Sequence, residues 1–310
     1  MDCRKLHRIV IALVLISPLA QAGVYQWRDE QGRLHFSDKP PANNDHSTSL
    51  YATAAPESRA GVVEFQRVDF NLSEAADQQV REGLNAILSL YTSTLGLDVR
   101  GDVSVKLSLI ESKQEFDRWL TARTGEPVGG LVSGVYVTAT KEVAVWNWAS
   151  EERVVQTILH ESSHVILAQL APRAPSWIHE GMAQYVQMLQ QRDNRIEIVP
   201  YPSAAARIRN WVESGELVSL RSYLNLPEQR WREMAHNMDA VPYSIAWGMV
   251  YFMMSSPVGQ QTLRRLLHDM EKSGQWPPAD AIDARYPGGL VKMDYDFFRW
   301  AQGEMAPHRH

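Results

Sequence analysis

The residues best suited to chemistry in this sequence are two histidines spaced four apart, His160 and His164, in the segment HESSH. On an α-helix, residues four apart lie on the same face, so both imidazoles point the same way. Two such imidazoles can bind one Zn²⁺ at about 2.0–2.1 Å each. Glu161 lies about 100° further around the helix. This pattern predicts a zinc site in which Glu161 is the general base toward a zinc-bound water. The alternative is two histidines with ordinary hydrogen-bond partners.

A catalytic zinc needs a third protein ligand and one open coordination position. Glu180 is the best candidate, because it follows a proline-containing loop and lies in the first turn of a second predicted helix. Ser176 can cap that helix, and the small Gly181 would let it approach the first helix closely. The sequence therefore predicts one Zn²⁺ bound by His160, His164 and Glu180. The alternative for Glu180 is an exposed acid at a helix start.

The segments HESSH and WIHEGMAQY, the latter at residues 177–185, resemble the two motifs of the gluzincin metallopeptidases. The second motif of that family is Trp-apolar-x-Glu-Gly-x-Ala. The resemblance is closest over residues 151–187, and the order of elements around it is similar to a peptidase-MA-like domain. The resemblance implies that His160, His164 and Glu180 are zinc ligands. It also implies that Glu161 is the catalytic base.

The sequence also departs from the gluzincin pattern. Many gluzincins have a carboxylate four residues after the third ligand, where it supports a ligand histidine, but this chain has Gln184 there. Because such partners tune ligand basicity, the substitution implies weaker zinc binding or lower activity. The amine-binding motif Gly-x-Met-Glu-Asn of related aminopeptidases is missing from the sequence. An endopeptidase is therefore expected rather than an aminopeptidase.

The tetrahedral intermediate of peptide hydrolysis needs a hydrogen-bond donor beside the zinc. We predict that Tyr243 supplies it, because Tyr243 begins an apolar segment expected to be a buried helix; the alternative is a core tyrosine with a satisfied hydroxyl. His179 and His236 are weaker candidates, since His179 points about 100° away from Glu180 around its helix. Residues 134–148 provide either a sheet edge for an extended peptide or an internal hairpin without a substrate role.

The elements that must position these residues follow from hydrophobic periodicity. The helix at residues 151–170 begins after the candidate cap Ser150 and is stopped by Pro172. Strands followed by helices predict an α+β fold, in which a small β-sheet and the active-site helix precede a mostly helical C-terminal part. The predicted elements are strands at 62–70, 103–110, 131–140 and 143–148, helices at 73–95 and 113–122, and an almost entirely helical remainder with a buried core helix at 245–254.

The N-terminus is predicted to be a secretory signal peptide, residues 1–22. A basic start precedes a short apolar run and a small-x-small cleavage site ending at Ala22. An uncleaved anchor is the alternative, but the run is shorter than the roughly 20 residues that span a bilayer. Cleavage removes Cys3, the only cysteine, so no disulfide is expected. We expect a periplasmic or secreted protein with no membrane span after cleavage.

Residues 23–41 contain two short alternating segments around a turn, which predicts a β-hairpin module. Their aromatic–Gly–aromatic-Ser-Asp-x-Pro pattern resembles a short N-terminal domain of unknown function found on many exported Gram-negative proteins. The resemblance implies an envelope location and attachment to the envelope through this module. Residues 42–60 are rich in Ala, Ser, Thr, Asn and Pro, which predicts a linker. Residues 61–310 are then the zinc metallopeptidase-like domain.

Composition narrows the classes of function. The chain has 310 residues, of which 45% are hydrophobic, so a fully disordered protein is excluded. Its net charge of −5 argues against a nucleic-acid partner. The leading hypothesis is a secreted zinc metallopeptidase acting on a peptide or protein substrate. The alternatives are a non-catalytic zinc-containing envelope binding or scaffold protein, and a hydrolase of cell-wall peptide cross-links.

Overall fold

The structure is a computed structural model, and its contacts divide the chain into two units, Met1–Arg59 and Ala60–His310. The two units are described separately. The predicted signal peptide and the predicted linker lie outside the described residues. The structure describes residues 25–28, 34–37, 62–99, 103–125, 132–192, 195–237, 240–273 and 278–310.

The first unit contains an antiparallel pair of strands, β1 (Tyr25–Arg28) and β2 (Leu34–Ser37). Tyr25 pairs with Ser37 and Arg28 pairs with Leu34. The two strands of the predicted hairpin are therefore confirmed, whereas the turn that joins them lies outside the described residues.

The second unit begins with a four-stranded sheet in the order β3-β4-β6-β5. Its strands β3, β4 and β6 run parallel, and β5 pairs antiparallel with β6 at one edge. A parallel pair needs a crossover connection, and α1 and α2 lie in the two crossovers. The bounds are β3 Val62–Val68, α1 Glu74–Ser89, β4 Ser104–Ile110, α2 Lys113–Thr124, β5 Gly134–Val137 and β6 Glu142–Trp146.

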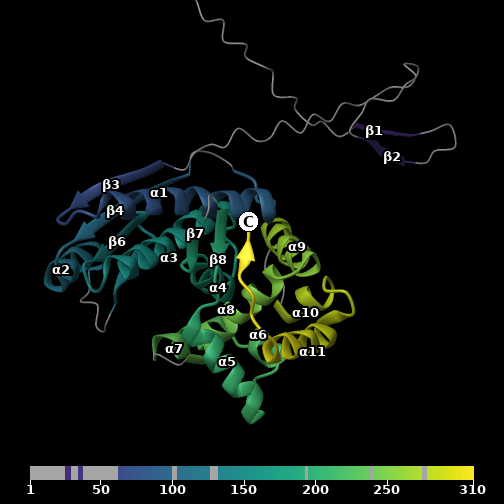
Figure 1. Cartoon of the computed structure of the whole chain (residues 1–310). Coiled ribbons are helices and arrows are strands. Elements are labelled where there is room, and N and C mark those ends of the chain that lie inside the picture. The colour runs from purple at the N-terminus through teal and green to yellow at the C-terminus, as the bar shows by residue number, and fades with distance from the viewer. Residues whose placement is uncertain are drawn as a thin grey trace, which may run out of the picture. The chain divides into compact units, whose positions relative to one another are not determined.

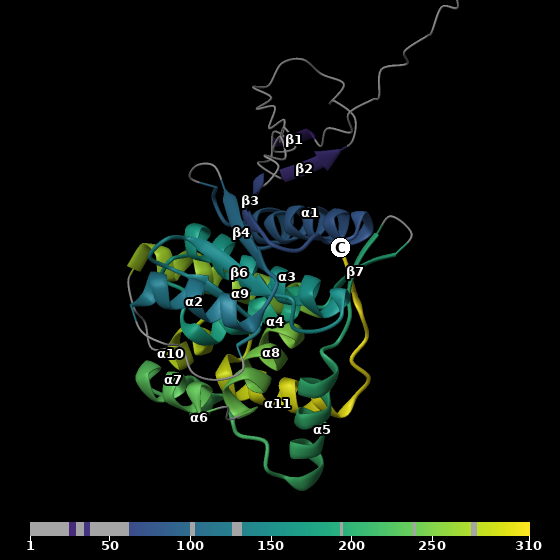
Figure 2. The ribbon, with the colours of Figure 1, turned by 90° about the vertical axis from the view of Figure 1, so that its left-hand side faces the viewer.

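Alternating side chains give this sheet two different faces, as expected for strands. On one face, Leu107 and Val143 belong to the main core together with residues of α1 and of the following helix, α3 (Glu151–Leu170). On the other face, Ile110 and Ala144 pack with Phe116 of α2 in a smaller cluster. Figures 1 and 2 show the sheet between these helices. The sheet therefore gives α3 a rigid surface on which to lie.

Helix α3 begins where predicted, but not with the predicted cap. Ser150 occupies the N-cap position, yet its side chain makes no capping hydrogen bond. Instead the Glu151 carboxylate accepts hydrogen bonds from the backbone N–H of Ser73, at 2.6 Å, and from its hydroxyl, at 2.7 Å. Ser73 is itself the N-cap of α1. The starts of α1 and α3 are thus joined through one carboxylate.

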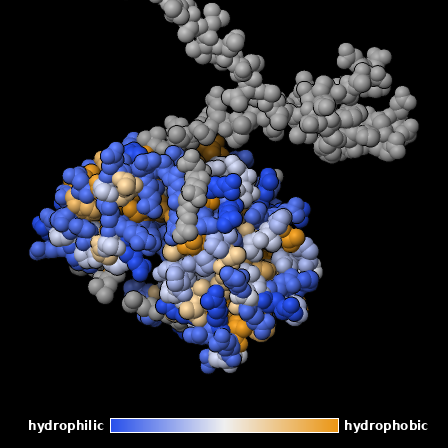
Figure 3. Space-filling view, viewed as in Figure 1, coloured by the Kyte–Doolittle hydropathy of each residue, from blue (hydrophilic) through white to orange (hydrophobic). Residues whose placement is uncertain are grey.

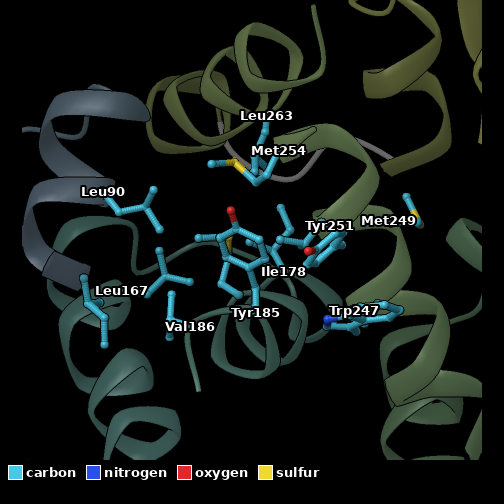
Figure 4. Close-up of a cluster of buried hydrophobic side chains, with 14 of the residues drawn as sticks. Leu90, Leu167, Ile178, Tyr185, Val186, Trp247, Met249, Tyr251, Met254 and Leu263 are labelled. Atoms are coloured by element: carbon cyan, nitrogen blue, oxygen red, sulfur yellow. The ribbon is translucent and has the colours of Figure 1, made fainter. Parts of the chain in front are cut away.

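Helix α4 (Ser176–Val186) lies at the centre of the second unit. Its N-cap is Pro175, so the prediction that Ser176 caps it is wrong; the Ser176 hydroxyl donates instead to Glu228. Proline fits this position because its ring fixes φ and the helix start needs no donor there. Figure 4 shows α4 side chains Ile178, Tyr185 and Val186 between two groups, Leu90 and Leu167 on one side and Trp247, Met249 and Tyr251 on the other.

The remainder is mostly helical, but three short strands were not predicted. Strands β7 (Leu189–Arg192) and β8 (Arg195–Ile198) form a hairpin, and the C-terminal β9 (His308–Arg309) pairs with β8. They are short and mainly polar, so they carry little strand signal. The helices are α5 Pro202–Ser214, α6 Leu220–Leu224, α7 Glu228–His236, α8 Ala240–Met254, α9 Pro257–Ser273, α10 Pro278–Asp283 and α11 Gly289–Gln302.

The predicted core helix at residues 245–254 forms the larger part of α8 and is buried throughout. Within the described part of the chain, no helix is both long enough and apolar enough to span a membrane. The face of the second unit seen in Figure 3 is mainly hydrophilic with scattered apolar residues. The α+β fold class predicted from the sequence is confirmed.

Candidate metal and catalytic site

Helices α3 and α4 bring His160, His164 and Glu180 together. The distance from His160 Nε2 to Glu180 Oε2 is 3.6 Å, and that from His164 Nε2 to Glu180 Oε1 is 3.7 Å. One nitrogen or oxygen atom from each residue lies within 4.8 Å of the others. Tetrahedral ligands at about 2.05 Å from a zinc ion are separated by about 3.3 Å. The three side chains, two imidazoles and a carboxylate, could therefore hold one metal ion after a small closing movement of the ligands.

A neighbouring amide fixes the orientation of His160. The Nδ1 atom of His160 lies 2.9 Å from Gln187 Oε1. Because an amide oxygen only accepts, Nδ1 carries a proton, and Nε2 is the ring nitrogen that faces Glu180. Sequence reasoning missed Gln187 and considered Gln184 instead. The missed signal was periodicity, since Gln187 follows Glu180 by seven residues, two helical turns on the same face.

The electrostatics of this cluster are dominated by burial and by mutual charge. Burial opposes protonation of His160, but its hydrogen bond to Glu180 and the charges of Glu161 and Glu180 outweigh that and raise its pKa to about 9. Burial lowers the pKa of His164 to about 4. Burial disfavours ionisation of Glu180, but the nearby histidines lower its pKa to about 2. At neutral pH the cluster thus combines an ionised Glu180 carboxylate, a neutral His164 imidazole and a His160 imidazole that is protonated on both ring nitrogens.

Glu161 lies on the side of α3 that faces the edge strand β5. Burial raises its pKa to about 7, while the backbone N–H of Tyr136 hydrogen-bonds to it and opposes that increase. Gly134 allows this close approach: a Cβ atom there would lie 2.6 Å from Thr157 Cγ2 and 3.1 Å from Glu161 Cγ. The carboxylate therefore lies beside the three candidate ligands with its orientation set by β5.

Two residues that the sequence suggested as oxyanion donors, Tyr243 and His179, lie near the candidate metal ligands. The Tyr243 ring packs against Trp231 at a centroid distance of 5.8 Å. Burial raises the pKa of Tyr243 to about 12, and the charges of Glu180 and Glu161 contribute to the increase. The His179 ring lies 6.0 Å from that of His164, although α-helical geometry predicted that it points away from the ligands.

Two expectations about the surroundings need correction. Gly181 was predicted to bring α4 close to α3, but a Cβ atom there would lie 2.5 Å from the carbonyl oxygen of Ala246, so this glycine permits the approach to α8. His236 is exposed at the end of α7. The edge position of β5 fits the predicted sheet edge; its role toward a substrate stays a prediction.

The C-terminal histidines, which the sequence does not connect to the helices, contact α4. The Tyr185 hydroxyl lies 2.9 Å from His308 Nδ1 and 3.0 Å from His310 Nε2. Because a hydroxyl both donates and accepts, it can satisfy both rings. Tyr185 and Glu180 belong to the same helix, so the chain's last residues help to hold the helix that carries the candidate third ligand.

Comparison with known proteins bears on the N-terminal part. A family model described as a domain of unknown function (DUF4124) matches residues 11–64. This match confirms the resemblance of the N-terminal segment to such a domain, and it is longer than the predicted module at residues 23–41. No curated protein and no solved structure matches the chain. The matched residues include none of the candidate site residues.

Proposed function

We propose that the second unit is a zinc-dependent peptidase of the gluzincin type, in an exported protein of the cell envelope. The observation that carries this proposal is the convergence of His160, His164 and Glu180 on one point, with Glu161 beside them. A structural zinc site would not require a buried carboxylate next to its ligands. A hydrolytic site requires one, as a base toward water.

In this proposal each residue has one role. His160, His164 and Glu180 hold the metal, and Gln187 orients His160. A bound Zn²⁺ supplies a Lewis acid for the scissile carbonyl and lowers the pKa of water. Glu161 accepts a proton from the attacking water and donates it to the leaving amine.

Two further groups act on the substrate. The Tyr243 hydroxyl donates a hydrogen bond to the oxyanion, which is the role that most needs a preorganised donor. The edge of β5, residues 134–137, pairs with the backbone of an extended peptide through groups other than the Tyr136 N–H, which hydrogen-bonds to Glu161. Main-chain pairing of this kind recognises the peptide's conformation rather than particular side chains, and it suits an endopeptidase.

The decisive experiment compares zinc-loaded wild-type protein with Glu161→Gln on an unfolded protein substrate, with and without a chelator. Glu152→Gln is the matched control, because Glu152 is on the same helix but exposed. We expect chelator-sensitive cleavage that falls by about 100-fold or more in Glu161→Gln, since general base catalysis contributes about 10²–10⁴. Zinc affinity should change little, and Glu152→Gln should cleave as the wild type does.

Two results would decide against a peptidase with this mechanism. Equal cleavage by the wild type and Glu161→Gln removes Glu161 from the mechanism. Zinc binding without cleavage of any protein or cross-linked cell-wall peptide favours the scaffold alternative, in which the metal has a structural role.

A further inference from the structure

A polar cavity of about 560 Å³ lies on the second unit between two segments that are far apart in the sequence. One is residues 94–98, at the end of the π-helical segment Leu90–Thr94 and in the loop after it, and the other is residues 257–268 of α9; Figure 1 shows α9 beside the end of α1. We call this hollow the α9 cavity. It shares no lining residue with the site around Glu180. Its lining includes Thr94, Gly96, Asp98, Gln261, Arg264, Arg265 and His268.

The α9 cavity concentrates positive charge in an acidic chain. Arg264 and Arg265 are consecutive and exposed, and Asp98 is the one acid among the lining residues. Some other arginines pair closely with acids, as Arg123 does with Glu142 at 2.6 Å. Among the described residues, no carboxylate lies within 4.0 Å of Arg264 or Arg265. Two cations without counter-ions in one hollow are typical of an anion site.

Backbone geometry places the Arg264 guanidinium in this cavity. A Cβ atom at Gly96 would lie 2.5–2.7 Å from the Nε, Cζ and Nη2 atoms of Arg264, so the guanidinium group lies directly against this glycine. Gly96 has a φ of +64°, in the left-handed region that glycine adopts most easily. The backbone N–H of Leu97 donates to the Tyr91 carbonyl at 3.0 Å, which holds the loop in place.

The cavity is also lined by residues that have neutral donor groups. His268 is one turn after Arg264 on α9, and Gln261 and Thr94 line the same cavity. Guanidinium groups bind phosphate oxygens in pairs of parallel hydrogen bonds, and neutral donors complete such sites. The volume is within the range of about 300–1,000 Å³ for small-molecule sites and exceeds that of one phosphate.

We propose that the α9 cavity binds a small phosphate-bearing ligand, with Arg264 and Arg265 as its main contacts. The phosphate can belong to a soluble molecule or to a lipid headgroup, which share this chemistry.

The test is calorimetric titration of the full chain with inorganic pyrophosphate at about 0.15 M salt, where surface charges are screened beyond about 8 Å. The protein is first treated with a chelator and dialysed, so that no metal at Glu180 can bind the anion. Arg264→Gln/Arg265→Gln is compared with Arg209→Gln/Arg299→Gln, which removes the same charge from exposed arginines outside the cavity. Thermal melts verify that both variants are folded.

We expect saturable binding that weakens by about 10-fold or more in the cavity variant and by less than about 2-fold in the control. Gln261→Ala, which keeps both charges, should weaken binding by about 3-fold. No saturation with the wild type overturns the proposal, as does equal weakening in both double variants.

A second arm identifies the source of the phosphate. Vesicles of phosphatidylcholine are compared with vesicles that also contain phosphatidate. Sedimentation of the protein with phosphatidate vesicles, reversed by pyrophosphate and lost in the cavity variant, assigns the site to a lipid headgroup. Pyrophosphate binding without sedimentation assigns it to a soluble ligand.

Discussion

Replacing Gln187 by methionine should weaken zinc binding without removing any zinc ligand. In the structure Gln187 Oε1 accepts the Nδ1 proton of His160 at 2.9 Å, and the His160 side chain is only 19% exposed. Methionine has nearly the same length as glutamine but offers no such acceptor. The imidazole of His160 then loses its partner, so its ring orientation and its basicity are no longer fixed.

The expected loss of zinc affinity follows from the contribution that such hydrogen-bond partners make at metal sites in general. Loss of a hydrogen bond to a ligand histidine typically lowers metal affinity by about 10- to 100-fold. This corresponds to about 1.4–2.7 kcal/mol of binding free energy. Gln187→Glu, which supplies a charged acceptor at the same position, should bind zinc at least as tightly as the wild type, because a carboxylate makes the imidazole a stronger base.

The assay is competition for zinc between the protein and a chromophoric chelator at fixed pH. Gln184→Met is the matched control, since Gln184 is buried on the same helix and is the position at which the sequence predicted a partner. We expect Gln184→Met to bind zinc as the wild type does. Wild-type affinity in Gln187→Met, or an equal loss in both variants, would refute the assignment of Gln187 as the orienting residue.

Three further predictions concern stability. Gly134→Ala should destabilise the fold by about 1–3 kcal/mol in urea, because its Cβ atom would lie 2.6 Å from Thr157. Tyr185→Phe should cost about 1–2 kcal/mol, since its hydroxyl contacts both C-terminal histidines. The hydrogen bonds from Ser73 lower the pKa of Glu151 below 4.5. The stability contributed by Glu151 is therefore present above about pH 4.5 and is lost as pH falls through the folded-state pKa, so the difference between wild type and Glu151→Gln should shrink in acid.

Each of these variants has a control within the chain. A Cβ atom at Gly303 would have its nearest contact at 3.5 Å, so Gly303→Ala should leave the urea midpoint unchanged. Tyr295 is 59% exposed, and Tyr295→Phe should be neutral. Glu152 contacts Gln156 on its own helix rather than Ser73, so Glu152→Gln should leave the urea midpoint at neutral pH unchanged. A stability loss in a control equal to that in its partner would contradict the contact assigned to that partner.

The local parts of the site could be predicted from the sequence because they depend on helical periodicity. The spacing of His160 and His164 fixes their common face whatever surrounds the helix. The α+β order, the buried helix at residues 245–254 and the approximate positions of strands β3 to β6 also followed from local pattern. The cap predicted at Ser176 did not follow, because a capping hydrogen bond competes with other partners nearby and the Ser176 hydroxyl donates to Glu228 instead. The Ser150 side chain also makes no capping hydrogen bond, and nothing in the structure explains this.

The sequence by itself determined which residues have the chemistry of a metal site and which helices carry them. Only the tertiary structure decided which other groups contact the residues of these helices. Gln187 rather than Gln184 lies beside His160, Gly181 lies against α8, and the C-terminal histidines contact Tyr185. The physical reason is that side-chain direction within one helix is set by its 3.6-residue turn. The approach of one segment to another is set by the packing of the whole core, which no local pattern encodes.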